Sequence, residues 1–390
     1  MARTLDESAL FSSAITPVRS LRAVAAVRLA LGLTALLGAI VFLEGTSWDI
    51  QWHSYIGRDR TLIPPHIMML SGVALSGIAG LLTVLIESWW ARRNQVVEQH
   101  SFGFAAIFKG PLGAYVVGYM ALIAAVAFPL DAYWHTLYGI DVAIWAPFHI
   151  MFVASMGIVE LGAAYMLISA VHLADGAGAP GIKRAATLGV VLALATVLGL
   201  FTLLLFDALD NGNFINLGFM SVTVFPLLSG LLVAFSLVAA VYALPWRWAA
   251  TSVVACYLLL AGIMALFVQP ATDWLLTVEH LTYRRAHPST SAVALEWFLA
   301  PLLVAVLIDG IMRRSQRKGW SRRKQTLFLT LTALLSGALP IIAIYPLFPV
   351  ALVLELGIGY LASVLPGWAG TYLGVFFGRN VGESMSLLER

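Results

Sequence analysis

Long, uninterrupted runs of apolar residues are the feature that most limits what this chain can fold into. Each run approaches or exceeds the roughly 20 residues that a transmembrane helix needs. We predict nine or ten membrane spans, at residues 22–44, 65–89, 113–130, 143–171, 184–207, 217–243, 247–269, 291–312, 325–346 and 349–378. Pro366 and Gly367 divide the last run, which is either one span or a helix followed by an interfacial piece.

The amino-acid composition excludes a water-soluble fold. Of the 390 residues, 60% are hydrophobic and only 11% are charged, whereas a soluble domain carries about 25% charged residues. The apolar runs are continuous and do not alternate, which favours helices over a transmembrane β-barrel. We therefore predict an all-α, polytopic transmembrane helical bundle. Its expected parts are an N-terminal tail at 1–21, a duplicated unit at 22–171 and a second helical bundle at 180–390.

The cations predict how the chain is oriented in a cell membrane. Lys and Arg gather before the first span and in the even-numbered loops, most densely at residues 313–324, whereas the odd-numbered loops hold Asp and few cations. Cytoplasmic loops carry the excess of Lys and Arg, so we expect a cytoplasmic N-terminus and outward-facing odd loops. The orientation signal in the loops also accounts for the formal net charge of +3. Because the excess of cations is small and has this explanation, we expect no nucleic-acid partner.

Two of the outward loops are copies of one motif. Residues 48–69 read WDIQWHSYIGRDRTLIPPHIMM, and residues 130–152 read LDAYWHTLYGIDVAIWAPFHIMF. Both contain D-x-x-x-H, then Ser or Thr, then G-x-D, then proline shortly before H-I-M. Each copy joins the end of one predicted helix to the start of the next. The match predicts two similar helix–loop–helix units within 22–171.

The spacing within each copy predicts a metal site. An Asp and a His four residues apart share one face of a helix, and the second His opens the following helix, so a tight hairpin brings all three together. The two predicted ligand sets are Asp49, His53 and His66, and Asp131, His135 and His149. Two imidazoles and a carboxylate suit copper, iron or zinc. Ionisable residues inside a membrane are costly and often functional.

Four further acids accompany these sets. Asp59 and Asp141 are matched in the two copies and either orient the imidazoles or serve as ordinary turn residues. Glu44 and Glu160 lie in apolar runs close to the sets and are candidates for a proton path, but for Glu160 an interhelical hydrogen bond is the favoured role. Residues 270–290 form the longest polar stretch and are expected to be a loop or an interfacial amphipathic segment.

The two ligand sets resemble metal sites in the C subunit of the copper membrane monooxygenases, which act on methane, ammonia or short alkanes. Asp49-x3-His53-x12-His66 and Asp131-x3-His135-x13-His149 have the spacings of two neighbouring copper sites there, in the same order. That family has asparagine where this chain has Asp131, and the added anionic ligand favours a harder metal ion. The resemblance implies copper, dioxygen, a small apolar substrate, and partner subunits, one of which bears cupredoxin domains.

Three functions are consistent with the sequence. The leading hypothesis is a metal-dependent membrane oxidoreductase of the monooxygenase kind, or one subunit of it. The second is a proton-coupled transporter of a metal or small solute, in which Glu160, Glu296 and Asp309 move protons. The third is a membrane protein that binds metal without catalysis.

Overall fold

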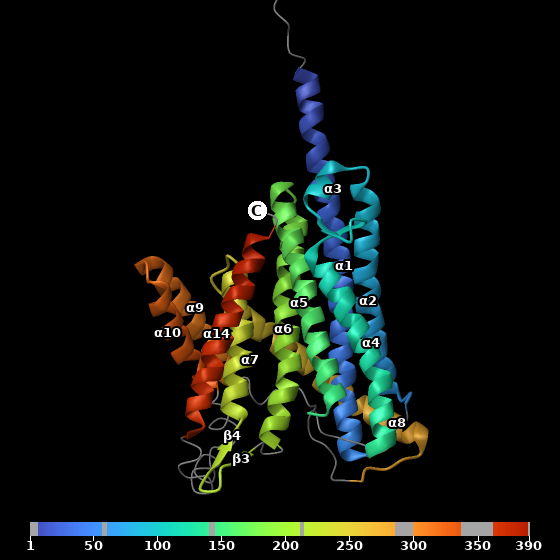
Figure 1. Cartoon of the computed structure of the whole chain (residues 1–390), viewed down its shortest axis with the longest axis vertical. Helices are drawn as coiled ribbons and strands as arrows, with labels where there is room; N and C mark the ends of the chain where they lie inside the picture. The colour runs from blue at the N-terminus through green and yellow to red at the C-terminus, as the bar shows by residue number, and fades with distance from the viewer. Residues whose placement is uncertain are drawn as a thin grey trace, which may run out of the picture.

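The structure, a computed structural model, describes residues 7–56, 61–139, 145–210, 214–284, 299–336 and 362–388. Its long helices are α1 (Glu7–Tyr55), α2 (Pro64–Ala91), α4 (Leu112–Tyr138), α5 (Pro147–Gly176), α6 (Pro180–Asp210), α7 (Phe225–Ala243), α8 (Ala249–Glu279), α9 (Leu299–Lys318) and α14 (Val364–Leu387). Most of them lie roughly side by side in one bundle, and α8 crosses behind them obliquely (Figure 1). The predicted tail is helical from Glu7 onward, as part of α1.

Seven of the described helices are long and apolar enough to cross a membrane, namely α1 from Val18, α2, α4, α5, α6 to Leu205, α7 and α8. This confirms the polytopic helical bundle, and the chain is a multi-pass membrane protein. The last three predicted spans run partly outside the described residues. Their described parts are α9, α14 and the short α10 (Arg322–Ala333).

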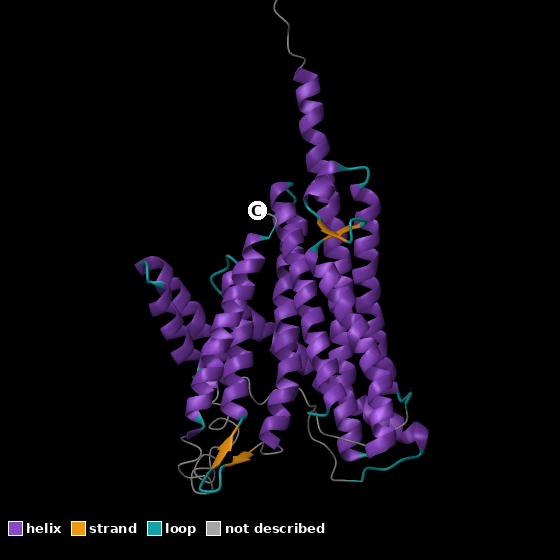
Figure 2. Cartoon of the chain, viewed as in Figure 1, coloured by secondary structure: helices purple, strands orange, loops and turns teal. Residues whose placement is uncertain are grey.

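Short elements complete the fold (Figure 2). Helix α3 (Gln95–Gln99) and the strands β1 (Phe102–Phe104) and β2 (Phe108–Gly110) join α2 to α4. The two strands pair antiparallel, with Gly103 opposite Lys109. A second antiparallel pair, β3 (Phe214–Asn216) with β4 (Ser221–Thr223), joins α6 to α7 at the opposite end of the bundle.

The duplicated motif folds into two helical hairpins, α1–α2 and α4–α5. Pro64 and Pro147 occupy the first positions of α2 and α5, where the missing N–H is not needed for a helical hydrogen bond. Helix α4 ends at Gly139, whose φ of 85° lies in the left-handed region that glycine tolerates best. A proline therefore starts the second helix in both copies, and Gly139 follows the end of the first helix in the second copy.

Glycines let the two helices of each hairpin approach closely. A Cβ on Gly38 or Gly72 would collide with the backbone of the opposite helix, α2 or α1. Gly113 of α4 and Gly162 of α5 meet in the same way. Small residues at such crossings are typical of membrane helices, whose association depends on close packing.

Helices α7 and α14 form the other intimate pair. A stripe of five glycines on α14 faces the backbone of α7, namely Gly367, Gly370, Gly374, Gly378 and Gly382. One continuous apolar core extends from Ala35 in α1 to Met385 in α14. The predicted units 22–171 and 180–390 thus share a core.

A buried ion pair joins α1 to α2 at the end away from the duplicated loops. Arg28 donates to both carboxylate oxygens of Glu87, at 2.7 and 2.8 Å, and neither side chain is exposed. Arg28 also donates to Ser169 Oγ of α5 at 2.5 Å and to the carbonyl of His100 at 2.6 Å. Ser101 donates to the same carboxylate. The Arg28 guanidinium thus has acceptors from two helices, α2 and α5, and from the loop after α3.

Helix α8 is longer than predicted. It runs through Pro270 to Glu279, so the first part of the polar stretch 270–290 is helical. Its last turns pack on Trp48 and Trp52 of α1, through Val268, Leu275 and Leu276. Polar contacts reinforce this packing, because Gln51 donates to Gln269 and accepts from Thr272. The apolar flank holds the segment in the helix despite the hydrogen bond that proline removes.

Candidate metal centres

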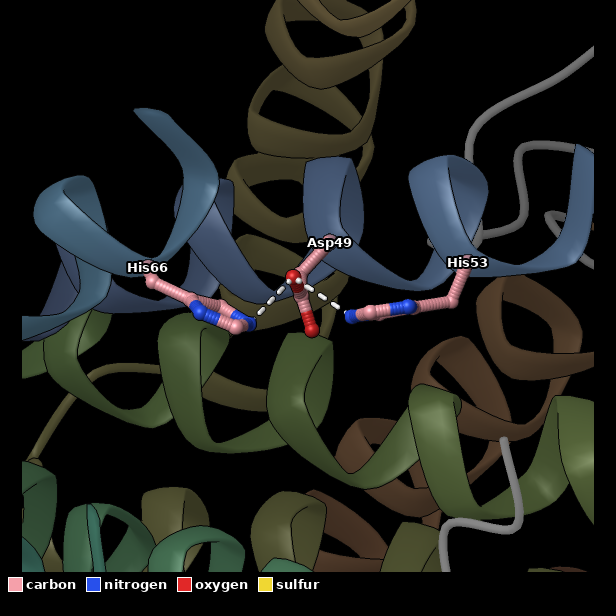
Figure 3. Close-up of side chains that lie close together, drawn as sticks. All are labelled: Asp49, His53 and His66. Carbon is pink, nitrogen blue, oxygen red and sulfur yellow. Dashed lines mark ion pairs between the residues drawn. The ribbon is translucent and has the colours of Figure 1, made fainter. Parts of the chain in front are cut away.

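The first predicted set converges at the end of the α1–α2 hairpin. Asp49 and His53 lie one turn apart on α1, and His66 is the third residue of α2. Asp49 Oδ1 lies 3.4 Å from His53 Nε2 and 3.0 Å from His66 Nε2. Figure 3 shows the carboxylate between the two imidazoles, with both Nε2 atoms directed at it. The predicted hairpin geometry therefore places the three side chains together.

The second set repeats this arrangement on α4 and α5. Asp131 Oδ2 lies 3.2 Å from His135 Nε2, and Asp131 Oδ1 lies 3.4 Å from His149 Nε2. The imidazole centroids are 5.8 Å apart in this set and 5.8 Å apart in the first. The sets differ in one respect. Asp49 uses one oxygen for both histidines, whereas Asp131 presents a different oxygen to each.

The donor spacing fits a single metal ion in each set. Two donors that each lie about 2.1 Å from one ion, with an angle of about 90–110° between them, are about 3.0–3.4 Å apart. In the first set the two separations from one oxygen of Asp49, 3.0 and 3.4 Å, fall in this range. In the second set the separations of 3.2 and 3.4 Å fall in it for the two different oxygens of Asp131. In each set one donor atom per residue lies within 4.8 Å of the other two. Two imidazole nitrogens and one carboxylate oxygen suit copper, zinc or iron, and three ligands leave coordination positions open.

Backbone carbonyls orient one imidazole in each set. The Nδ1 of His66 lies 3.2 Å from the carbonyl oxygen of Thr61, and the Nδ1 of His135 lies 3.0 Å from that of Gly139. When Nδ1–H donates to a carbonyl, the lone pair is left on Nε2, which is the nitrogen that faces the aspartate. Metal-binding histidines almost always have such an outer partner. Each loop thus both closes the hairpin and selects the ligand nitrogen.

Both sets border one cavity. A space of about 60 Å³ is lined by Asp49 and His53 of the first set and by His149 of the second. Its other walls are largely apolar and come from α1, α2, α5 and α6: Phe42, Thr46, Ile50, Met69, Phe152, Val153 and Leu203. A row of aromatic rings also links the sets, because Phe128 packs edge-on against His66 and then against Phe152. The two centres therefore belong to one site.

The other sequence-predicted residues are placed differently. Glu44 is buried in α1, and Glu160 is fully buried in α5. Neither Glu160 oxygen has a hydrogen-bond partner among the described residues, so the expected interhelical hydrogen bond is not formed there. Asp59, Asp141 and Glu296 lie outside the described residues.

Asp309 of α9 has a structural contact. Its carboxylate accepts hydrogen bonds from the backbone N–H groups of Ala250 and Thr251, and from the Thr251 hydroxyl. These groups form the first turn of α8, where unpaired N–H donors attract an acidic side chain. Asp309 therefore caps a helix, a contact that the transporter hypothesis did not anticipate.

Sequence reasoning missed several residues that complete the site. The backbone carbonyls of Thr61 and Gly139 could not be identified from residue type, because every residue has a carbonyl. Their position within the two repeated loops is the sequence signal that could have pointed to them. Leu203 enters from α6, which lies outside the duplicated unit, and Gln51 braces α1 against α8. Helix periodicity identifies a buried face but not the helix that will cover it.

No protein family matches the chain, and neither a curated protein nor a solved structure does.

Proposed function

We propose that this chain is a copper-dependent membrane oxidoreductase, or the membrane subunit of one, that oxidises a small apolar substrate with dioxygen. The observation that carries the proposal is the pair of matched Asp/His/His sets around one cavity of about 60 Å³. Ligands of this kind suit several metal ions and reactions. We choose copper and dioxygen chemistry because the spacing of the two sets resembles that in the C subunit of the copper membrane monooxygenases.

The ligands favour copper on chemical grounds. Among divalent first-row metals, sites built from nitrogen and oxygen bind copper most tightly. Imidazole is a good copper ligand, and the carboxylate neutralises part of the ion's charge inside the membrane protein. Copper bound there would supply the electron transfer that dioxygen chemistry needs. Iron and zinc remain the alternative occupants of the same donors.

The cavity sets the size and polarity of what reaches the centres. A water molecule needs about 10–15 Å³ of such space, so 60 Å³ accommodates only a few small molecules. Ligand pockets for drug-sized molecules are about 300–1,000 Å³. Apart from Thr46 and the side chains of the two sets, the lining is apolar and includes Phe42, Ile50, Phe152, Val153 and Leu203. Dioxygen and a short hydrocarbon match this description, and both partition into the bilayer.

The chain's own residues hold the centres in place. The Thr61 and Gly139 carbonyls fix the His66 and His135 rings, and α8 braces the turn of α1 that carries Asp49. Glu44 and Glu160 are the buried acids nearest in sequence to the sets and would hold or pass protons. Cupredoxin-bearing and other membrane subunits would supply electrons at the outward face, where the positive-inside rule places both centres.

Proton-coupled transport is less well supported. Transporter sites usually lie near the bilayer midplane, whereas both sets lie at the ends of their helices. Asp309, one of the three acids in that hypothesis, caps α8. Glu296 lies outside the described residues. Of the two acids that the structure describes, Glu160 has no hydrogen-bond partner among the described residues.

Metal analysis of the purified protein in nanodiscs tests the proposal. We expect one copper ion per set, the loss of one ion in His53→Ala or His135→Ala, and the loss of both in the double variant. His280→Asn is the matched control, because His280 is exposed and its φ of 54° is one that asparagine tolerates. Equal metal content in the wild type and the double variant would refute metal binding at these sets.

Dioxygen consumption separates an enzyme from a protein that only holds metal. We expect the copper-loaded protein, together with co-purified subunits, to consume dioxygen with short alkanes or ammonia, and the double variant to consume none. Stoichiometric metal without consumption by the reconstituted complex would favour non-catalytic binding over catalysis.

A further inference from the structure

A long apolar groove opens on the outer wall of the bundle, between α2 and α4. It has a volume of about 470 Å³. None of its described lining residues is charged, and most belong to the two helices, from Val73 to Val84 on α2 and from Ala114 to Ala125 on α4. Ile78, Leu81 and Leu122 on its rim are more than half exposed. The groove lies away from both metal sets and does not depend on the proposed function.

The length of the groove matches one leaflet of a bilayer. From Val73 to Val84 the helix rises about 16 Å, whereas half of the hydrocarbon core is about 15 Å thick. A transmembrane helix of a partner would follow the whole span of about 30 Å. The groove instead ends near the middle of α2 and α4, which is the depth that an acyl chain reaches from one membrane surface.

One end of the groove is closed by the β1–β2 hairpin, whose aromatic residues Phe104 and Phe108 line it. The hairpin is fixed to α2 at this end. The backbone N–H of Lys109 donates to Ser88 Oγ at 2.8 Å, and Ser88 Oγ donates back to the Lys109 carbonyl at 3.0 Å. Ser88 lies one turn beyond Val84, so Lys109 stands directly above the end of the groove.

Cations surround this end. Lys109 Nζ lies 3.4 Å from Glu98 Oε1 and is about one-third exposed, at 31%. The Arg93 guanidinium stacks on Trp89 at 4.6 Å. Trp89 continues the same exposed apolar stripe of α2 as Ile78 and Leu81. The surface thus changes, over two turns of α2, from the apolar groove to an aromatic rim and then to two cations, of which Lys109 is paired with the exposed Glu98 and Arg93 is stacked on Trp89.

We propose that the groove between α2 and α4 is a binding site for one acidic diacyl phospholipid. One acyl chain fills the channel beside Gly118, the glycerol region meets the aromatic rim, and the anionic headgroup lies against Lys109 and Arg93. Basic residues at a membrane surface attract acidic headgroups, and aromatic side chains are typical of the interface. The apolar channel supplies affinity, and the two cations supply the preference for negative charge.

A substitution at Gly118 would block the groove between α2 and α4. A Cβ added there meets no atom within 4 Å, and Gly118 lines the groove, so the side chain of Gly118→Leu starts in open space within it. Gly262 on α8 is the matched control, because it is also a glycine of a candidate span with nothing within 4 Å of an added Cβ. Arg93→Gln with Lys109→Gln removes the two cations and leaves the channel open.

Native mass spectrometry of the full chain from nanodiscs of equal phosphatidylglycerol and phosphatidylcholine tests the site. We expect the wild type and Gly262→Leu to retain one phosphatidylglycerol through delipidation, and Gly118→Leu to retain it at least ten-fold less. The Arg93→Gln/Lys109→Gln variant should keep a bound lipid but lose the preference between the two headgroups.

Three results would overturn the proposal. The first is equal lipid retention in the wild type and Gly118→Leu. The second is equal retention of both lipids by the wild type, which would remove the role of the cations. The third is a dimer in the wild type that Gly118→Leu abolishes without a change in bound lipid, which would identify the groove as an interface between two copies.

Discussion

Removing Glu87 should destabilise the protein more than any surface substitution, because it leaves a positive charge buried. In Glu87→Met the Arg28 guanidinium loses both charge-assisted hydrogen bonds, at 2.7 and 2.8 Å, while its side chain stays inaccessible to water. Deleting one partner of a buried ion pair costs about 3–5 kcal/mol. That corresponds to a decrease of roughly 10²- to 10⁴-fold in the ratio of folded to unfolded protein.

The assay is reversible unfolding in mixed micelles, followed by circular dichroism. Lys183→Met is the control, because Lys183 also pairs with a carboxylate, Asp175 Oδ1 at 2.6 Å, but both side chains are well exposed. A surface pair of that kind contributes about 0–1 kcal/mol. The two substitutions remove ion pairs of nearly equal length, so the difference between them measures the effect of burial.

The double variant Arg28→Met/Glu87→Met decides whether the stranded charge is the cause. Replacing a whole buried pair by apolar side chains is often neutral or stabilising, so the double variant should be more stable than Glu87→Met alone. If it is less stable, or if Glu87→Met unfolds like the wild type, the reasoning is refuted.

Three further predictions concern packing, burial and pH. Gly72→Leu should separate α1 from α2 at Gly38, because a side chain there collides with the backbone of α1. We expect a lower free energy of unfolding and less metal bound at the first set, measured by unfolding and by metal analysis. Unchanged metal content would contradict the close crossing. Glu160→Met should raise the free energy of unfolding by about 1–3 kcal/mol, because it removes a buried carboxyl group that has no hydrogen-bond partner among the described residues. A less stable variant would indicate a partner elsewhere in the chain. Burial and the hydrogen bond to Asp273 raise the pKa of Tyr283 to about 12, so its stabilising contribution is fully present below about pH 10 and is lost as pH rises through about 12. Tyr283→Phe should remove that alkaline dependence, which ultraviolet titration during unfolding would detect, whereas an unchanged profile would exclude Tyr283 as its source.

The ligand sets were predictable because their geometry is local. The interval of four residues fixes Asp49 relative to His53 on one helix face, and the proline-started helix after a short loop brings His66 back. The same logic applied unchanged to the second copy. No long-range contact had to be known, and the structure brings all six side chains into the expected two groups.

The sequence did not predict the contacts that depend on which helices are neighbours in the bundle. Leu203 of α6 closes the cavity, and the end of α8 supports α1, because distant helices happen to cover those faces. The apolar period of a span reveals that a face is buried but carries no information about its partner. The sequence makes Asp309 a candidate proton carrier for the same reason, because its hydrogen bonds to the first turn of α8 cannot be inferred from sequence.

Each donor set is built entirely within one hairpin, and the ligands of each set come from that hairpin alone. A substitution in one hairpin therefore changes the donors of one set and leaves those of the other set intact. Asp131 belongs to the α4–α5 hairpin alone, so replacing it would alter the second set of side chains without altering the first.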